Sequence, residues 1–321
     1  MDKIVLCLLT DYVLNSPIFK FWENNLIENG IKLNKISVTA GCKDYLKLFQ
    51  EHKNIITWNC RTKHDWIKNQ NKNVLFIDNS FFIQGSGIFL DSEGFFYDSN
   101  LQKRCTDEIF VSEDDKNKIN DTIFKKFKYN FYSHDCKNKK ILVALQHHLD
   151  SNINFQFPFG EKFTDKVEAT LCFIKTFLNE DSDVTIRPHP RFLKHWEENL
   201  PKYKKSFWNE KWNIDYEKSP YSILPKYNSL ISVNSTLVNE AICLGIPIAT
   251  LGVGAFSGHS VTLECAREFN QLNQLMEFNL DKNKAYEYIY KALNHNTLHH
   301  SDEESKIINN EEWKRFLNKI S

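Results

Sequence analysis

The chain has 321 residues, of which 41% are hydrophobic and 26% are charged, so it can bury a full core. Its 41 basic and 41 acidic residues cancel, which argues against a dedicated nucleic-acid-binding protein, although local basic patches could still touch a membrane surface. A chain of this length predicts two domains, since one α/β domain usually takes about 100–200 residues.

The first part of the chain alternates short apolar runs with helical patterns, as a parallel sheet covered by helices does. The strands are expected at residues 3–10, 32–40, 54–58 and 73–78, and the helices near 16–29, 43–52 and 62–70. Residues 81–100, rich in glycine and aromatic side chains, predict loops and short strands that form part of a ligand surface. The charged, Lys/Asn-rich residues 112–140 predict the connection between two domains, 1–135 and 136–321.

The second part restarts the same alternation. The strands are expected at residues 139–146, 183–190, 212–216, 230–233 and 246–254, and the helices at 164–179, 191–200, 219–227, 235–244, 283–295 and 303–319. The last helices could pack back on the first domain. The pattern predicts two Rossmann-like α/β domains with a cleft between them.

The 8 cysteines are scattered, without a CxxC pair, and several lie in apolar periodic segments as buried reduced thiols do. Neither a zinc site nor a disulfide framework is expected. The apolar run in MDKIVLCLLTDY is far too short to span a membrane and has no small-residue cleavage site, so it predicts a buried strand. These features favour a reduced, soluble, cytoplasmic protein.

Residues 230–256 have the pattern of one strand–helix–strand unit with a polar hinge at its first turn. Ser235 and Thr236 can cap the helix, and Gly245 can end it. Because the helix would begin at the carboxyl end of a parallel strand, its free N–H groups and dipole predict an anion site, and nucleotides are the usual anions there. Taken alone, an ordinary helix cap is the better interpretation of these residues.

Two other predicted strands also end in polar residues. Residues 146–151, QHHLDS, contain Asp150, which could act as a nucleophile or general base; the alternative is an Asx turn with exposed histidines. Residues 187–191, RPHPR, hold His189 between two prolines and two arginines, which suits a phosphate or carboxylate; the alternative is a rigid turn with solvated arginines. Ligands bind outside the carboxyl ends of parallel strands, so three such ends together predict one site.

These motifs, in this order, resemble the bacterial capsular polysaccharide β-Kdo transferases, which build a lipid-linked Kdo linker. Gln146 and Asp150 match a strand–QxxxD motif, and residues 187–190 match a strand–[KR]xHP motif. The third motif is matched by Ser232, Asn234, Ser235, Thr236, Glu240, Ala241, Gly245 and Pro247. Residues 78–100 resemble the family segment EDGFLRS…LG…LvlD..GiYYD, with Asp78-Asn79-Ser80 in place of Glu-Asp-Gly. The length corresponds to a single transferase module.

The resemblance implies a glycosyltransferase-B-like fold, with the acceptor side in residues 1–135 and the CMP-sugar donor side in 136–321. It implies a retaining transfer of Kdo from CMP-β-Kdo by double displacement, without a metal or another cofactor. Asp150 would attack the anomeric carbon, His189 with Arg187 would neutralise the departing phosphate, and Asp78 would take the acceptor proton. The implied donor contacts are Gln146, Arg187, Pro190, Ser232, Asn234, Ser235, Thr236 and Glu240.

The partners implied are a nucleotide-sugar donor and a glycolipid or polysaccharide acceptor, met in the cytoplasm or at the inner face of the cytoplasmic membrane. The aromatic residues in 81–97 are the expected acceptor surface, with ordinary packing as the alternative. A sialyltransferase-like enzyme using CMP-sialic acid is one alternative function, because such proteins also carry an HP motif and a Ser/Thr motif. A non-catalytic sugar-binding subunit of the same fold is the other.

Overall fold

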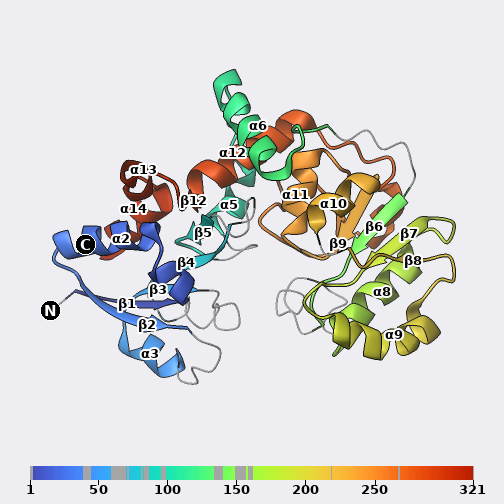
Figure 1. Cartoon of the computed structure of the whole chain (residues 1–321), viewed down its shortest axis with the longest axis horizontal. Coiled ribbons are helices and arrows are strands. Elements are labelled where there is room, and N and C mark those ends of the chain that lie inside the picture. Colours follow the sequence, from blue (N-terminus) through green and yellow to red (C-terminus); the bar gives the residue numbers. More distant parts are fainter. Residues whose placement is uncertain are drawn as a thin grey trace. The chain divides into compact units, whose positions relative to one another are not determined.

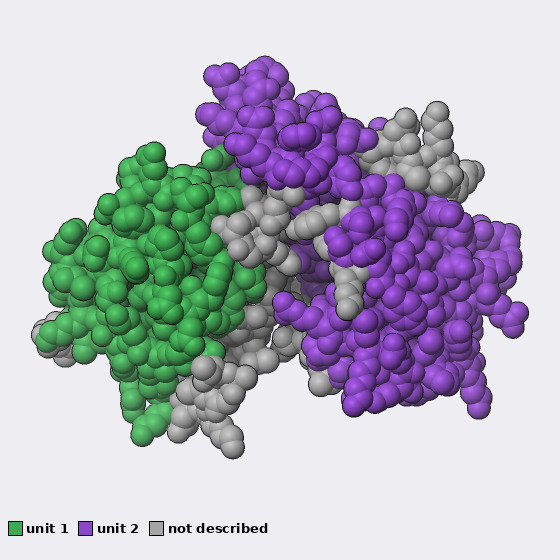
Figure 2. Space-filling view, in the orientation of Figure 1, with its two compact units in different colours: residues 1–104, 291–321 green, residues 105–290 purple. Residues whose placement is uncertain are grey.

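The computed structural model describes residues 3–38, 45–58, 70, 72–80, 82, 87–94, 99–133, 140–148, 157, 162–217, 219–266 and 268–320. The chain forms two compact units, one from residues 1–104 with 291–321 and the other from residues 105–290 (Figure 1, Figure 2). The first unit is therefore discontinuous in sequence. The units divide at 104/105 and 290/291, whereas the predicted boundary lies at 135/136.

The second unit is built on a six-stranded sheet with the order β11-β10-β9-β6-β7-β8, in which every pair is parallel. Its strands are β6 (Lys140–Ala144), β7 (Asp183–Arg187), β8 (Asn213–Ile214), β9 (Ser229–Ser232), β10 (Ile248–Thr250) and β11 (Leu263–Glu264). The inner strands are almost entirely buried, as parallel strands covered on both faces are.

The helices of this unit are α6 (Glu113–Phe127), α8 (Lys166–Phe177), α9 (Leu193–Phe207), α10 (Pro220–Ile223) and α11 (Leu237–Leu244), with 3-10 turns at Leu224–Lys226 and Phe269–Gln274. A further helix, α12 (Lys282–His295), begins in the second unit and ends in the first. The segment predicted as a connection contains the helix α6, which belongs to this unit, and Tyr286 of α12 donates a hydrogen bond to Asn120 of α6 at 2.9 Å.

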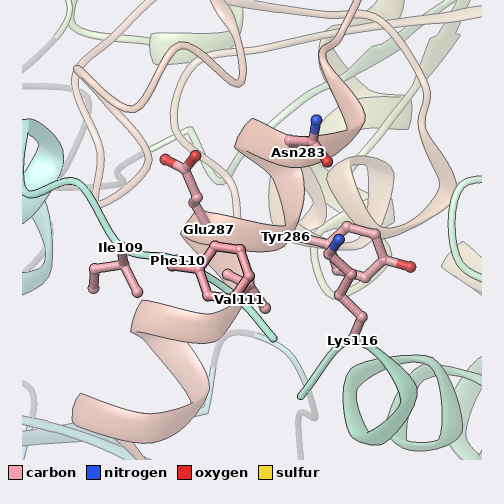
Figure 3. A pocket seen from close by; sticks show the side chains of 7 residues that line it. All are labelled: Ile109, Phe110, Val111, Lys116, Asn283, Tyr286 and Glu287. Carbon is pink, nitrogen blue, oxygen red and sulfur yellow. The ribbon is translucent and has the colours of Figure 1, made fainter. Parts of the chain in front are cut away.

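A pocket of about 350 Å³ lies between the start of α6 and α12. Figure 3 shows Ile109, Phe110 and Val111 from the segment before α6 on one side, with Tyr286 and Glu287 of α12 on the other. Phe110 is 90% exposed at this place. None of the site residues predicted from the sequence lines this pocket.

The first unit is built on a six-stranded sheet with the order β12-β5-β4-β3-β1-β2. Its strands are β1 (Ile4–Leu9), β2 (Lys32–Ser37), β3 (Asn54–Trp58), β4 (Asn73–Asn79), β5 (Gly87–Asp91) and β12 (Thr297–His299). The first four pair in parallel as predicted, but β5 is antiparallel to both β4 and β12. The connection 80–86 is too short for the crossover that a parallel pair needs, so β5 must turn back beside β4.

The helices of the first unit are α1 (Asp11–Leu14), α2 (Pro17–Glu28), α3 (Tyr45–Glu51), α5 (Asn100–Lys103), α13 (Glu304–Ile308) and α14 (Glu311–Ile320), with a 3-10 turn at Arg104–Thr106. Residues 303–319 form two helices instead of the one predicted, because Asn310 Oδ1 accepts the N–H groups of Glu312 and Trp313 and starts a new helix. Trp313 then stacks on Trp22 of α2, with ring centroids 4.9 Å apart. The helix predicted near 62–70 lies almost wholly outside the described residues.

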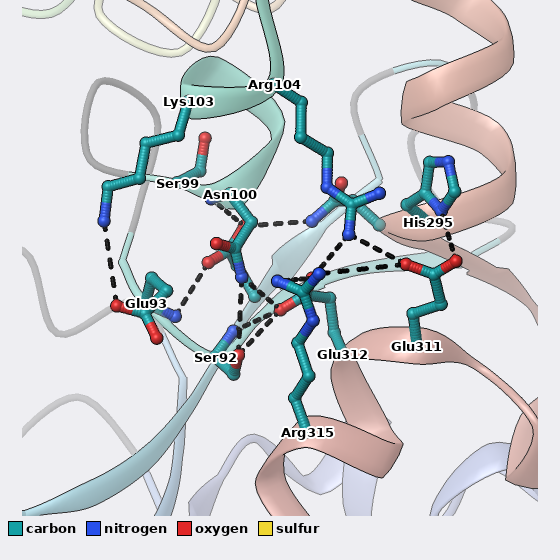
Figure 4. A network of polar contacts seen from close by, with 12 residues as sticks. Ser92, Glu93, Ser99, Asn100, Lys103, Arg104, His295, Glu311, Glu312 and Arg315 are labelled. Atoms are coloured by element: carbon teal, nitrogen blue, oxygen red, sulfur yellow. Dashed lines mark hydrogen bonds and ion pairs between the residues drawn. The ribbon is translucent and has the colours of Figure 1, made fainter. Parts of the chain in front are cut away.

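A buried polar network joins α14 to β5 and α5 (Figure 4). Glu312, which is 0% exposed, accepts hydrogen bonds at Oε2 from Ser92 N at 2.9 Å, Ser92 Oγ at 2.8 Å and Asn100 Nδ2 at 2.8 Å. Its other oxygen lies 3.6 Å from Arg315 Nη1 and 3.9 Å from Arg104 Nη2. The buried charge of Glu312 is therefore matched by donors and two cations, as burial of a charge requires.

Asp91 lies beside Glu312 in the same network and is also 0% exposed. Its carboxylate accepts three backbone N–H groups and the Asn296 Nδ2 group at 2.9 Å. Burial and the neighbouring Glu312 carboxylate raise the pKa of Asp91 to about 8, while the backbone donors act in the opposite direction.

Within the described ranges, every helix is too short or too polar to cross a lipid bilayer.

Candidate active site

Three polar segments of the second unit leave neighbouring strands at the same level of the sheet. Ala144, the last residue of β6, pairs with Arg187 at the end of β7 and with Ser232 at the end of β9 (Figure 1). Residues 145–148, 188–191 and 233–236 therefore begin side by side at one edge. This convergence, predicted from the sequence alone, is confirmed by the strand register.

Gln146 and Asn234 hold two of these segments together. The Gln146 Nε2 group donates to Asn234 Oδ1 at 2.9 Å, and the Asn234 backbone N–H donates to Gln146 Oε1 at 2.9 Å. Asn234 Nδ2 also donates to the carbonyl of Val253, at 3.3 Å. Both amide side chains are buried, at 8% and 4% exposure, so each bond is made away from competing water. The Oγ of Ser232 below them donates to the Ala144 carbonyl at 3.4 Å.

The helix α11 begins after this pair, and its first N–H groups are already used within the chain. Ser235 accepts from Leu237 N at its Oγ, at 3.3 Å, and from Val238 N at its carbonyl, at 3.1 Å. The N–H of Asn239 donates to the Thr236 carbonyl at 3.0 Å. The expectation of free N–H groups at these three positions was wrong, because the turn folds back on itself. Ser235 and Thr236 are partly exposed, and the helix dipole favours an anion near this helix start.

The turn after β7 fixes the orientation of His189. The backbone N–H of Arg191 donates to His189 Nδ1 at 3.3 Å, and the N–H of Phe192 donates to the His189 carbonyl at 2.9 Å. Since Nδ1 accepts, the proton of the neutral imidazole is assigned to Nε2, which can donate to a ligand. His189 and Pro190 are partly exposed, so this turn is open to a bound molecule.

Arg187 lies deeper than a surface phosphate ligand usually does. It is 7% exposed, and its Nε donates to the Glu217 carbonyl at 3.0 Å. Burial lowers the pKa of Arg187, while the carboxylates of Glu240, Asp215 and Glu217 raise it. Glu240, on α11, is itself 4% exposed. Arg187 and Glu240 are therefore opposite charges buried beneath the strand ends.

Of the other two predicted catalytic residues, one lies outside the described residues and one belongs to the first unit. Asp150 lies outside the described residues. Asp78 belongs to the first unit, at the carboxyl end of β4, where it is 6% exposed and its Oδ1 accepts the Asn79 backbone N–H at 2.8 Å. Across the described part of the chain, no group of three or more His, Cys, Asp or Glu side chains is placed to hold a metal ion.

Sequence reasoning missed a group of aromatic rings beside the strand ends. His148 stacks on His195 of α9, with centroids 3.5 Å apart and planes at 9°, and His147 lies 3.5 Å from the ring of Phe192. The ring of Phe192 is in turn 5.3 Å from His189. The available signal was the spacing of residues 192 and 195, which places both rings on the first turn of one helix.

The two units have the glycosyltransferase-B-like fold. The structure is similar to that of the KpsC β-Kdo 2,7 transferase of Thermosulfurimonas dismutans, with a TM-score of 0.58 and 16% sequence identity over 93% of this chain and 92% of that one. It is also similar to the KpsC β-Kdo 2,4 transferase of the same organism, with a TM-score of 0.54 and 12% identity over 90% of each chain.

A family model described as capsule polysaccharide biosynthesis protein matches residues 85–301. The chain therefore belongs to the capsule polysaccharide biosynthesis protein family, as its motifs indicated. Comparison with curated protein sequences finds no match.

Proposed function

We propose that this protein is a retaining glycosyltransferase that moves Kdo from CMP-β-Kdo to a surface-polysaccharide or glycolipid acceptor. The observation that carries the proposal is the convergence of three polar strand ends in the second unit of a capsule-family chain. The similarity in fold to two β-Kdo transferases supports the choice of donor. In this proposal the second unit binds the donor and the first unit binds the acceptor.

The reaction would take two displacements. In the first, a carboxylate oxygen of Asp150 forms a bond to the anomeric carbon of Kdo, and the bond to the phosphate oxygen breaks, so that CMP leaves with the electron pair. In the second, the acceptor hydroxyl attacks the same carbon from the opposite side to Asp150 and releases that carboxylate. Asp78 takes the proton of the hydroxyl. Two inversions at one carbon retain its configuration.

The strand-end residues would bind the leaving nucleotide. His189, through its Nε2–H group, and the partly exposed Ser235 and Thr236, through their hydroxyls, would donate hydrogen bonds to the phosphate. Arg187 is buried, so it would contribute its charge from beneath and hold the Glu217 segment in place. Gln146 and Asn234 would keep these donors at a fixed spacing. Glu240, Ser232 and Pro190 would line the rest of the donor site.

The decisive experiment is intact-protein mass spectrometry after incubation with CMP-Kdo in the absence of acceptor. We expect an adduct of the mass of one Kdo residue, located on Asp150 by peptide mapping and absent in Asp150→Asn. An adduct of the same size on another residue would overturn the assigned nucleophile.

A donor panel of CMP-Kdo and CMP-sialic acid, scored by CMP release with a glycolipid acceptor present, tests the sugar. Faster release from CMP-sialic acid would replace the proposal with a sialyltransferase. A folded protein that releases no CMP from either donor would point instead to a sugar-binding subunit.

A further inference from the structure

The ring group beside the strand ends takes no part in the reaction proposed above, yet it is tightly anchored at one end. His195 Nε2 lies 3.3 Å from Asp165 Oδ2. The hydroxyl of Tyr203, which is 0% exposed, donates to the same carboxylate oxygen at 2.5 Å. Asp165 Oδ1 accepts the Val167 backbone N–H at 2.8 Å and so caps α8. His195 is thus fixed to two helices, α8 and α9.

The ring of His148 rests on this anchored imidazole. The two rings are nearly parallel, with centroids 3.5 Å apart. The Nδ1 atom of His148 is buried and has no hydrogen-bond partner among the described residues. Its backbone carbonyl accepts from Lys166 N at 3.1 Å. Among the ring contacts of His148, that with His195 has the shortest centroid distance, 3.5 Å against 4.2 Å to His147 and 6.0 Å to Phe192.

We propose that His195 is a positioning residue: held by Asp165 and Tyr203, it supports the His148 ring and thereby fixes the segment that leaves β6. The inference rests on the proposed function, because the chain reaches Asp150 two residues after His148. On its other side the segment touches the HP turn, since His147 packs on Phe192 and Phe192 packs on His189. One set of rings thus contacts both the segment that leaves β6 and His189 of the HP turn.

The stack also makes this restraint depend on pH, because two imidazolium rings at 3.5 Å would repel each other. Burial and the charge of His195 lower the pKa of His148, opposed by Asp165. A histidine with a lowered pKa in the folded state stabilises fully above its ordinary pKa of about 6.5 and loses that contribution as the pH falls below it.

The surrounding charges come from each element packed against the stack. They are Asp165, Lys166 and Glu168 at the start of α8, Lys202 on α9, and His189 and Arg191 in the HP turn. Lys202 pairs with Glu168 and also interacts with Asp165, whose carboxylate opposes the lowering of the His148 pKa.

Hydrogen exchange of the Leu145 and Lys166 amides, which donate to the Arg187 and His148 carbonyls, is followed by mass spectrometry at pH 7.5 and 5.5 and tests the inference without any substrate. We expect His195→Ala to exchange these amides about tenfold faster at pH 7.5, corresponding to about 1.4 kcal/mol of lost local protection. His195→Phe keeps a flat ring that cannot be protonated, so it should restore most of the protection and reduce the difference in protection between the two pH values, because burial of His148 remains. Lys194→Ala, on the same helix with a 90% exposed side chain, is the matched control and should exchange as the wild type does.

Kinetics then separate positioning from binding. In His195→Ala we expect kcat for transfer to fall about tenfold, while the Kd for CMP changes less than about twofold, because the backbone N–H groups of Arg191 and Phe192 hold His189 independently of His195. Unchanged exchange in His195→Ala would overturn the inference whatever the enzyme does. If His195→Ala exchanges faster but the wild type transfers no Kdo, the positioning role of His195 holds and the proposed function is wrong.

Discussion

At the scale of single residues, the geometry of the candidate site depends on a few buried polar contacts between neighbouring strand ends. Gln146 and Asn234 exchange two hydrogen bonds at 2.9 Å, so each satisfies the other where water cannot. A pair of this kind specifies position more than it adds stability, because a hydrogen bond gained on folding replaces one made with water. Loss of one partner is nevertheless costly, because the other amide stays buried without a hydrogen bond.

Replacing Gln146 with alanine should therefore destabilise the protein. The change leaves the backbone N–H and the Oδ1 of Asn234 without their partner, at about 1–3 kcal/mol for each buried group. Urea denaturation measures the loss, and Gln271→Ala is the control, because that side chain is bonded at the exposed surface and its removal should stay within about 0.5 kcal/mol. Equal unfolding midpoints for the two variants would contradict the buried pair.

His189→Ala should weaken the binding of CMP by about tenfold or more, since a hydrogen bond to a charged phosphate contributes about 1.5–3 kcal/mol. Isothermal titration calorimetry with CMP alone measures the change. His52→Ala, in the first unit, is a suitable control because His52 bonds only within its own neighbourhood there. An unchanged affinity in His189→Ala would remove the phosphate role from the HP turn.

At the scale of elements, the strand–helix–strand unit from β9 to β10 shows what a sequence pattern can and cannot predict. Its order, its helix and its end at Gly245 follow from apolar periodicity and turn residues, and they are confirmed. The use of the first N–H groups within the turn was not predictable, because it depends on the path of the backbone at Ser235. Periodicity locates a helix, but it does not fix which donors stay open.

Long-range pairing explains the other differences. The strand β12 has three residues and pairs with β5, which lies more than 200 positions earlier, so no local pattern marks it. His195 and Asp165 were missed likewise, because they meet across two helices. The strand ends, in contrast, were predictable: parallel strands place their carboxyl ends at one edge whatever the intervening sequence.

Gly245 tests the close packing at the end of α11. Its φ is +77°, and a Cβ there would lie 2.9 Å from Cδ2 of Tyr132, whose own N–H is bonded to the Cys243 carbonyl. Gly30 has a similar φ of +72° with open space around it. We expect Gly30→Ala to cost about 1–2 kcal/mol from the backbone alone. Gly245→Ala should cost about 1–3 kcal/mol more, from the added overlap. Denaturant unfolding measures the free energy of unfolding of both variants. Equal decreases would show that the Tyr132 ring moves aside without cost.

At the scale of the whole molecule, the first unit depends on residues from both ends of the chain. Its sheet is completed by β12, and its core by the stacking of Trp313 on Trp22. The network around Asp91 and Glu312 then connects α14 to the strand β5 (Figure 4). The stability of this unit is therefore carried by contacts between segments that the second unit separates in sequence.

This network predicts a dependence on pH with a definite sign. The pKa of Asp91 is raised from 3.8 to about 8, so the protonated form is favoured by folding. Its contribution to stability is complete below its ordinary pKa and is lost as the pH rises through about 8. The free energy of unfolding of the wild type should fall from pH 6 to pH 9 relative to that of Asp91→Asn, which cannot ionise. A difference that stays constant over this range would contradict the raised pKa.

The split of the first unit also has a consequence for its biosynthesis. The chain leaves the ribosome with β1 to β5 complete, but the strand that covers the outer edge of β5 is made only after residues 105–290. At a translation rate of about 5–20 residues per second, this delay lasts about 10–40 s. Throughout that time the apolar strand Gly87–Asp91 presents an open edge, the kind of surface on which nascent chains aggregate. Every newly made copy must pass through this interval, so the yield of folded protein should depend on chaperones that shield the edge until translation ends.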